Sequence, residues 1–305
     1  MSKETSDSAW DAKALGGSWK RKIVNPDLLE ERAKCTFDQT ELNRLFFDHA
    51  DYIQQMNELV KEHPELIEGN MERYDMSREE NFAFIWKRIK RTMELKPEVL
   101  VSDESSKPFI YYFGDAIGPL NLHFAVFTKT IEGLASPEQQ EMWLDKARKL
   151  NIIGCYAQTE LGHGSNVSDL ETTATLDMKT DEFVIHTPNV KATKVWAGDI
   201  TISSHAAVFA RLKIEDNDYG VWPFMVPLRN LEDYSPLPGV EVGDLGSKIG
   251  FKIMDNGYCV FNNVRIPRTN LFARLIDVQK DGSVALKGNP KIVYSMMLKT
   301  RILLA

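Results

Sequence analysis

The sequence predicts an α+β protein: an N-terminal helical domain, then a β-barrel or β-sandwich domain, then the first part of a C-terminal helix. Before about residue 150, apolar residues recur at spacings of three and four, as in helices. After it they alternate with polar residues, as in strands. The final residues return to helix formers. We therefore expect a polar extension over 1–24, a helical domain over 25–151, a β domain over 152–275, and a linker with the start of a helix over 276–305.

Three signals mark helix starts in the first half. Residues 77–80 (SREE) have the form of a capping box, in which serine and glutamate satisfy each other's backbone N–H groups. Residues 136–137 (SP) place proline at the first helical position, where its missing N–H costs nothing. Asp38 with Glu41 indicates a third start, before a segment that runs to about His63.

Two of the predicted helices have informative faces. Behind residues 77–80 the apolar side chains share one face, and they are Phe82, Ile85, Trp86, Ile89 and Met93. Residues 120–134 are apolar on several faces, which predicts a buried helix too short to span a membrane.

The second half predicts short strands separated by turns. Residues 172–187 alternate on both sides of a polar turn at 179–182, which is a hairpin pattern. Further β-rich runs lie at 205–212, 219–228 and 257–267, and the turn residues at 255–257 separate two of the elements. Many short strands at this spacing favour a sandwich or small barrel.

Composition excludes several classes of function. The net charge of −7 does not favour nucleic acid, and no apolar run approaches the roughly 20 residues of a membrane span. The first residues have no apolar core of a secretory signal. The three cysteines are far apart, which argues against a disulfide framework or a structural zinc site and for a reducing compartment.

The stretch CYAQTELGHGSN at 155–166 is the first candidate site. It lacks the third glycine of a dinucleotide fingerprint, His163 has no partner at metal-ligand spacing, and Ser165 is not in a G-x-S-x-G elbow. Two interpretations remain. The glycines could let backbone N–H groups approach an anionic or carbonyl oxygen of a flavin or phosphate, beside the hydroxyls of Thr159 and Ser165. Alternatively, the stretch is a tight turn joining helix to strand.

The stretch KVWAGD at 194–199 is the second candidate. Trp196 stands two residues before Gly198, and an aromatic ring beside a glycine can form a wall on which a planar ring stacks. A tryptophan in the core is the alternative. Residues 216–220 (DNDYG) lack the glutamate that completes a calcium loop, so we expect a hairpin turn there.

The chain ends on an apolar helical pattern over 292–305. The residues alone leave two interpretations open: a short terminal helix docked on the strands, or a chain that stops inside a domain.

Several motifs in order resemble the peroxisomal acyl-CoA oxidases. They are NPDLLEERAKCTFD, IIGCYAQTELGHGSNVSDLETTATLD, KVWAG, PLPGVEVGDLGSKIG, MDNGY and FNNVRIPRTNLFAR. The resemblance covers roughly Asn25 to Ala305. The related acyl-CoA dehydrogenases share a T-E-x-x-x-G-S segment, but YAQTELGHG favours the oxidases.

The resemblance implies an FAD-dependent oxidation of fatty acyl-CoA by molecular oxygen to trans-2-enoyl-CoA and hydrogen peroxide, in the peroxisome and in a homodimer of the full-length protein. It implies that Thr159 contacts the flavin through its hydroxyl and that Gly198 lines the isoalloxazine, with Trp196 a weaker candidate. Glu160 is not the base of this family. A non-catalytic relative that binds acyl-CoA or oxidase subunits, or a dehydrogenase relative, is the alternative.

The sequence also departs from the family. The family's catalytic glutamate is expected beyond Ala305, which favours a cut chain that is inactive alone, and no peroxisomal tripeptide ends the chain. The segment after Gly198 lacks the family's usual glycines and lysine, and Asp199 is expected to bring a negative charge near the cofactor.

Overall fold

The computed structural model describes most of the chain, namely residues 30–31, 33–70, 72–97, 119–251, 253–289 and 291–295. The expected polar extension over 1–24 lies outside the described residues. The chain divides into two compact units, 1–118 and 119–305, and each is described by itself.

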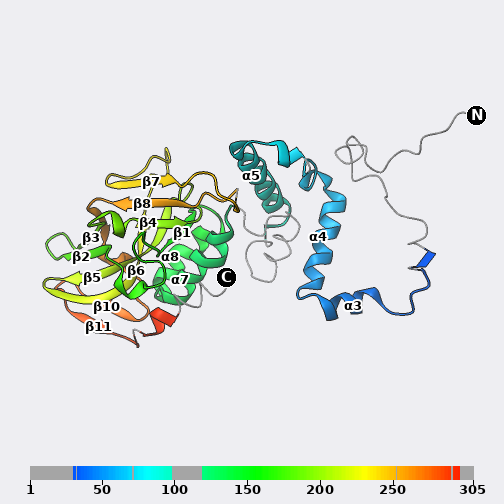
Figure 1. Cartoon of the computed structure of the whole chain (residues 1–305). Coiled ribbons are helices and arrows are strands. Elements are labelled where there is room, and N and C mark those ends of the chain that lie inside the picture. The colour runs from blue at the N-terminus through cyan, green and yellow to red at the C-terminus, as the bar shows by residue number, and fades with distance from the viewer. Residues whose placement is uncertain are drawn as a thin grey trace, which may run out of the picture. The chain divides into compact units, whose positions relative to one another are not determined.

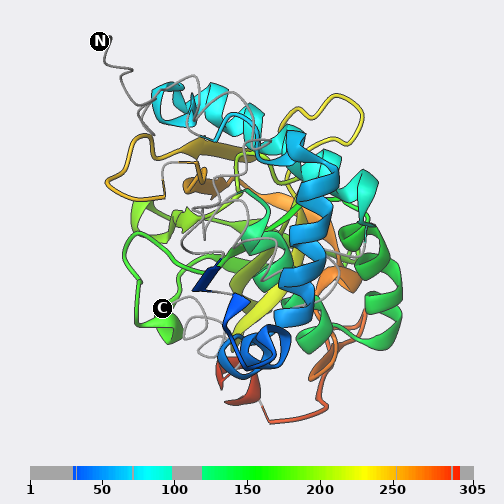
Figure 2. The same ribbon diagram turned by 90° about the vertical axis from the view of Figure 1, so that its right-hand side faces the viewer.

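Two helices of the first unit lie where the sequence predicted one segment. Asp38 caps α3 (Gln39–Phe46), its side chain accepting from two backbone N–H groups as expected. The helix ends there, and α4 (Ala50–Glu62) follows after a break at which His49 is left-handed, with φ 63°. Figures 1 and 2 show the change of direction between α3 and α4.

Helix α5 (Arg78–Leu95) confirms the predicted capping box. The Glu80 N–H donates to the Ser77 hydroxyl at 3.2 Å, and the Ser77 N–H donates to the Glu80 carboxylate at 2.8 Å. Ile85 and Ile89 of the predicted face are buried, and the other three members are half-buried. A local signal and an amphipathic stripe thus account for this helix.

The second unit opens with the predicted buried helical stretch. A π-helical turn (His123–Phe127) leads into α7 (Thr128–Leu134), and α8 (Pro137–Arg148) follows with a complete capping box at Ser136. The π-helical turn is fixed against the first strand, because the Gly154 N–H donates to His123 Nδ1 at 2.9 Å.

Eleven strands are named in the second unit. They are β1 (Gly154–Ala157), β2 (Thr173–Asp177), β3 (Glu182–His186), β4 (Lys194–Ala197), β5 (His205–Ile214), β6 (Asn217–Pro227), β7 (Val240–Asp244), β8 (Gly257–Phe261), β9 (Val264–Pro267), β10 (Ile276–Val278) and β11 (Val284–Leu286). The predicted hairpins at 172–187 and 216–220 are confirmed, as β2–β3 and β5–β6.

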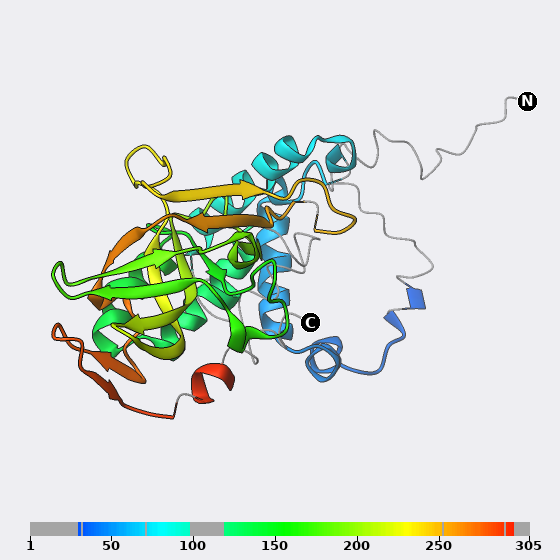
Figure 3. The same cartoon turned by 60° about the vertical axis from the view of Figure 1, so that its left-hand side comes forward.

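The strands form two main sheets around one apolar core. The larger sheet has the order β1-β5-β2-β3-β9, with β6 on the other edge of β5, and the smaller has the order β4-β8-β7. Eight of the ten residues of β5 are buried, and this strand pairs with β1, β2 and β6 at the centre of the larger sheet. Figures 1 and 3 show the β7–β8 pair and the β10–β11 hairpin on opposite sides of this curled β unit.

At the edges of this unit one sequence expectation is wrong and one is confirmed. Asp255 and Asn256 are each only 3% exposed, so residues 255–257 are a buried connection into β8 and not a surface turn. Residues 291–295 are helical as predicted, with Val293 in the core. The remaining apolar pattern, from residue 296, lies outside the described residues.

Candidate functional site

The glycine-containing stretch after β1 is a closed tight turn. Glu160 and His163 exchange backbone hydrogen bonds at 3.2 and 3.0 Å. The N–H of Leu161 donates to Thr193 O, and that of Gly162 donates to Lys191 O, at 2.9 and 2.8 Å. These four N–H groups are therefore occupied, and the interpretation of this turn as an anion cradle is wrong for residues 160–163. The turn interpretation is correct, although it follows a strand and not a helix.

These bonds pair residues 159–162 with residues 191–195, which include the start of β4. The Val195 N–H donates to Thr159 O at 3.0 Å, and Glu160 pairs with Lys194 as an isolated antiparallel bridge. The two candidate stretches, separated by residues 167–193 in the sequence, therefore lie side by side. Thr159 and Trp196 are brought to adjoining positions of this ladder.

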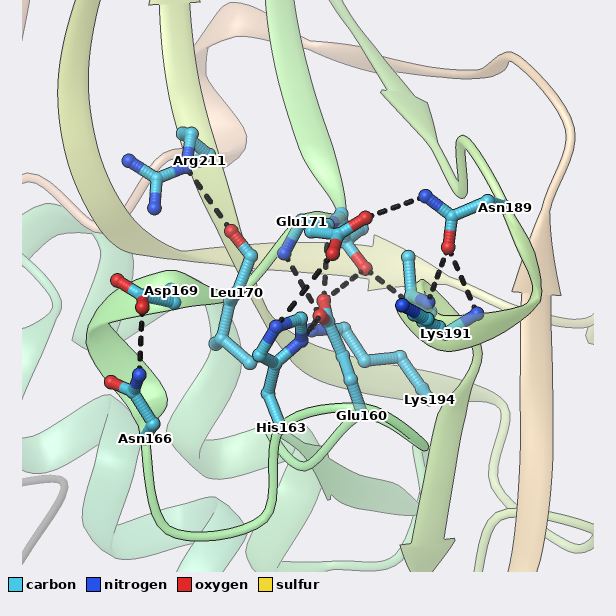
Figure 4. A network of polar contacts seen from close by, with 12 residues as sticks. Glu160, His163, Asn166, Asp169, Leu170, Glu171, Asn189, Lys191, Lys194 and Arg211 are labelled. Atoms are coloured by element: carbon cyan, nitrogen blue, oxygen red, sulfur yellow. Dashed lines mark hydrogen bonds and ion pairs between the residues drawn. The ribbon is translucent and has the colours of Figure 1, made fainter.

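Glu160 is at the centre of a buried polar network (Figure 4). Its side chain has no exposed surface. Oε1 accepts from Lys194 Nζ at 3.0 Å and from the N–H and hydroxyl of Thr172 at 2.9 and 2.6 Å. Oε2 accepts from the Glu171 N–H at 2.8 Å and lies 3.0 Å from His163 Nδ1. All its acceptor sites are used, so Glu160 cannot serve as a catalytic base.

Lys194 is the cation of this network and is also fully buried. Its ammonium donates to Phe209 O at 2.7 Å, to Glu160 Oε1 at 3.0 Å and to Gln158 O at 3.1 Å. Burial lowers the pKa of Lys194 to about 8, against the opposing effect of the neighbouring carboxylate. Burial alone would raise the pKa of Glu160, but Lys194 and the Thr172 bonds hold it below its ordinary value.

Trp196 projects from an irregular part of the ladder. The pairing of β4 with β8 shifts between Val195 and Ala197, and Trp196 between them has a φ of 64°. Its side chain is 55% exposed, so the interpretation as a core tryptophan is wrong. A bulge of this kind re-aims a side chain away from its sheet. Asn256 Nδ2 holds the turned backbone by donating to Trp196 O at 3.3 Å.

Gly198 is closely packed against the side chains of Leu122 and Met254. A Cβ at this position would lie 2.5 Å from Leu122 Cδ1 and 2.7 Å from Met254 Sδ. A Cβ added at Gly164, in the first candidate stretch, would meet no atom within 4 Å. Of these two glycines, only Gly198 is therefore kept by a close contact.

Asp199 is buried beside a second carboxyl. Its Oδ1 accepts from the Leu120 N–H at 3.2 Å, and its Oδ2 has no hydrogen-bond partner among the described residues. Asp255 Oδ2 accepts from the N–H and hydroxyl of Thr201, and its Oδ1 is likewise unpartnered there. Burial, and then Asp255, raise the pKa of Asp199 to about 8. The expectation of a negative charge here is wrong, because the neutral form is favoured at pH 7.

Sequence reasoning missed three residues next to the candidates. Lys194 and Thr172 complete the Glu160 network. Gln158 is 1% exposed, and neither amide atom has a partner among the described residues. A lysine at the start of an alternating strand and a glutamine directly after the apolar strand β1 were the available signals, since polar groups in buried positions need partners.

Two family matches cover adjoining parts of the chain. Residues 39–153 match "Acyl-coenzyme A oxidase N-terminal", and residues 155–264 match "Acyl-CoA dehydrogenase, middle domain". The chain is 43% identical over 289 residues to peroxisomal acyl-coenzyme A oxidase 1 of Arabidopsis thaliana, with 90% of this chain and 42% of that protein covered. The chain belongs to the acyl-CoA oxidase family.

Other acyl-CoA oxidases give the same result. Peroxisomal acyl-coenzyme A oxidase 1 of Rattus norvegicus is 34% identical over 284 residues, covering 91% of this chain and 43% of that protein. A solved Caenorhabditis elegans acyl-CoA oxidase-2, bound with FAD, ascaroside-CoA and ATP, superimposes with a TM-score of 0.83 at 40% identity, covering 92% of this chain and 43% of that chain. This acyl-CoA oxidase chain thus spans less than half the length of these relatives.

The predicted fold class is confirmed: a helical N-terminal domain precedes a curled β-sheet domain, as in the solved oxidases, and a helix begins at 291. Within the part of this oxidase chain that the structure describes, no group of three or more His, Cys, Asp or Glu residues could hold a metal ion. No helix of the described residues is long and apolar enough to cross a membrane.

Proposed function

We propose that this chain forms the flavin-contacting part of an FAD-dependent acyl-CoA oxidase, which converts acyl-CoA and oxygen to trans-2-enoyl-CoA and hydrogen peroxide. The observation that carries the proposal is the adjoining placement of Thr159 and Trp196 on the ladder closed by the Val195–Thr159 hydrogen bond of 3.0 Å. Thr159, Trp196 and Gly198 are here called the flavin wall. The predicted domain bounds 25–151 and 152–275 belong to the same proposal.

The wall fits a flavin on three counts. Trp196 offers an exposed aromatic face for a planar ring. Thr159 is half-buried, so its hydroxyl can donate to a flavin carbonyl while its backbone is held in the ladder. Gln158, which precedes it, has a buried amide that lacks partners among the described residues, as expected beside a polar group that binds there.

The flavin, when bound, supplies the acceptor for the hydride from the acyl β carbon. The chain's own residues orient it: Thr159 by a hydrogen bond, Trp196 by its ring, and Gly198 by keeping the backbone close to Leu122. The base that takes the α proton is proposed to be a carboxylate outside the described residues, because Glu160 is saturated with donors.

The proposal also specifies molecular oxygen as the electron acceptor. The named relatives are oxidases and two are called peroxisomal, which supports an oxidase in peroxisomal fatty acid β-oxidation over a dehydrogenase. A homodimer of the full-length protein is proposed on the same family likeness.

The first test is a titration of the chain with FAD. We expect saturable quenching of tryptophan fluorescence together with a shift of the flavin visible spectrum, because Trp196 would lie against the ring. The variant Trp196→Phe should retain the spectral shift and lose most of the quenching. A wild-type chain that shows neither signal would contradict the proposal.

The second test follows the reaction. Peroxide that appears with loss of saturated acyl-CoA supports an oxidase. Reduction of an added dye without peroxide indicates a dehydrogenase. FAD binding with no acyl-CoA turnover in the full-length protein supports the non-catalytic alternative.

A further inference from the structure

The Glu160–Lys194 pair joins the two halves of the flavin wall, and this inference rests on the proposed function. The three N–H bonds of the Lys194 ammonium meet three acceptors on three different elements: the end of β1, the turn after it, and β5. Lys194 itself belongs to β4 in the smaller sheet. The ammonium therefore fixes the smaller sheet against the larger one at this point.

Thr159 lies between two of the groups that Lys194 holds. Gln158 O accepts from the ammonium at 3.1 Å, and Glu160 Oε1 accepts at 3.0 Å. One cation thus restrains the residue before Thr159 and the residue after it. Trp196 follows Lys194 by two positions on the same strand, so this side chain adds to the Val195–Thr159 backbone bond in restraining Thr159 relative to Trp196.

Backbone pairing in this region is irregular. Three backbone hydrogen bonds join residues 159–162 to residues 191–195, but Glu160 and Lys194 meet in an isolated bridge, and the regular pairing of β4 with β8 breaks between Val195 and Ala197. The side-chain network adds directed bonds beside this irregular point.

The outer members of the network hold Glu160 in turn. Oε2 accepts from the Glu171 N–H at 2.8 Å and contacts His163 Nδ1 at 3.0 Å, which closes the turn. The Thr172 hydroxyl donates to Oε1 at 2.6 Å and ties the turn to the start of β2. Figure 4 shows the His163 and Lys194 side chains pointing toward the Glu160 carboxylate.

The chemistry of the pair favours a positional role over a stabilising one. An apolar pair of the same size usually gives equal or greater stability than a buried ion pair, because both charges must leave water. What an apolar pair cannot supply is directed hydrogen bonds that set distances between three elements. We propose that Glu160 and Lys194 are positioning residues of the flavin wall, holding Thr159 and Trp196 at the spacing that a flavin ring needs.

The test is the neutral double variant Glu160→Gln/Lys194→Met, which leaves no unpaired charge. Denaturant unfolding, FAD affinity and hydrogen exchange are compared with the wild type. We expect most of the stability to be retained, FAD affinity to fall by about tenfold or more, and exchange to rise in peptides containing residues 159–162 and 191–196. A purely structural pair would change stability and FAD affinity together.

The matched control is a second ion pair of the β unit that lies in other loops. Arg268 Nε donates to Asp181 Oδ1 at 2.7 Å beside the β2–β3 turn. The double variant Asp181→Asn/Arg268→Met removes an ion pair that is partly exposed and away from the flavin wall, and its FAD affinity should equal that of the wild type.

A gentler variant guards against misfolding. Thr172→Val removes the 2.6 Å donor to Glu160 and keeps the charges and the branched shape. We expect FAD affinity to fall about two- to fivefold, since one hydrogen bond is lost. Wild-type FAD affinity in this variant, or in a folded double variant, would overturn the inference while leaving the proposed function intact. Failure of the wild type to bind FAD would overturn both.

Discussion

Two buried clusters on either side of Trp196 deal with carboxyl groups in opposite ways. The Glu160 cluster contains a cation and enough donors for every oxygen, and the pKa of Glu160 is held below its ordinary value. The Asp199 cluster brings two carboxyls together, and burial raises the pKa of both. Burial by itself therefore does not decide the charge of a carboxyl. The partners that share the buried site decide it.

The comparison predicts opposite effects on stability when one ionisable side chain of each cluster is replaced by a neutral one. Lys194 and Asp199 stand at the two ends of residues 194–199. Variants of the two clusters therefore test the same part of the fold.

The largest effect is expected for Lys194→Met. This change leaves the Glu160 carboxylate buried without its cation, which typically costs about 3–5 kcal/mol of the free energy of unfolding. Denaturant unfolding at pH 7 measures it. The exposed Lys149, paired with Asp145 at 2.8 Å, provides the control, since Lys149→Met should change stability by less than about 1 kcal/mol. Equal stability losses in the two variants would show that the buried pair has no special energetic role.

The second effect should have the opposite sign. The pKa of Asp199 is about 8 when folded and near 3.8 when unfolded, so its stabilising contribution is complete below pH 3.8 and is lost as pH rises through 8. In that window stability should fall by up to about 1.4 kcal/mol per pH unit for one bound proton. Asp199→Asn keeps an acceptor for the Leu120 N–H and removes the proton.

We therefore expect Asp199→Asn to flatten the pH profile and to be more stable than the wild type at pH 8, by about 1–3 kcal/mol. Unfolding curves between pH 5 and 9 give the comparison. A wild-type profile with no downward slope above pH 6 would contradict the raised pKa.

The sequence predicted those features of this region that depend on near neighbours. The capping box at residue 77, the helix start at residues 136–137 and the β2–β3 hairpin were correctly placed because their partners lie within a few residues. Lys194 was not recognised, since its partners Gln158 and Glu160 lie 36 and 34 residues away and Phe209 belongs to another strand. Long-range pairing leaves no periodic signal.

The two candidate stretches show the same limit. The glycine loop looked open because its N–H acceptors, Lys191 O and Thr193 O, belong to a distant segment. A tryptophan in the core was the commoner expectation for Trp196, but a bulge at this strand turns its side chain outward, and no local residue predicts the bulge. The assignment of Thr159, Trp196 and Gly198 to a flavin site stays a prediction.

The third effect concerns the close packing of Gly198 against Leu122 of the helical stretch. Gly198→Ala places a Cβ 2.5 Å from Leu122 Cδ1 and should cost about 1–3 kcal/mol through overpacking. Gly164→Ala is the matched control, because its Cβ would meet nothing within 4 Å. Thermal unfolding of both variants tests the difference. If both lose the same stability, packing does not explain the glycine at 198.

The smallest effect is expected for a change within the flavin wall that leaves both buried clusters intact. Thr159→Val keeps the backbone bond to the Val195 N–H and removes only the hydroxyl, so the fold should be unchanged. Loss of one hydrogen bond to a flavin carbonyl is worth about 0.5–1.5 kcal/mol, which corresponds to about a 2- to 12-fold weaker FAD affinity. Ser165→Ala, an exposed hydroxyl in the same loop, should leave the affinity unchanged. Equal FAD affinity of Thr159→Val and wild type, with Trp196 still quenched, would place the flavin against Trp196 alone and remove Thr159 from the wall.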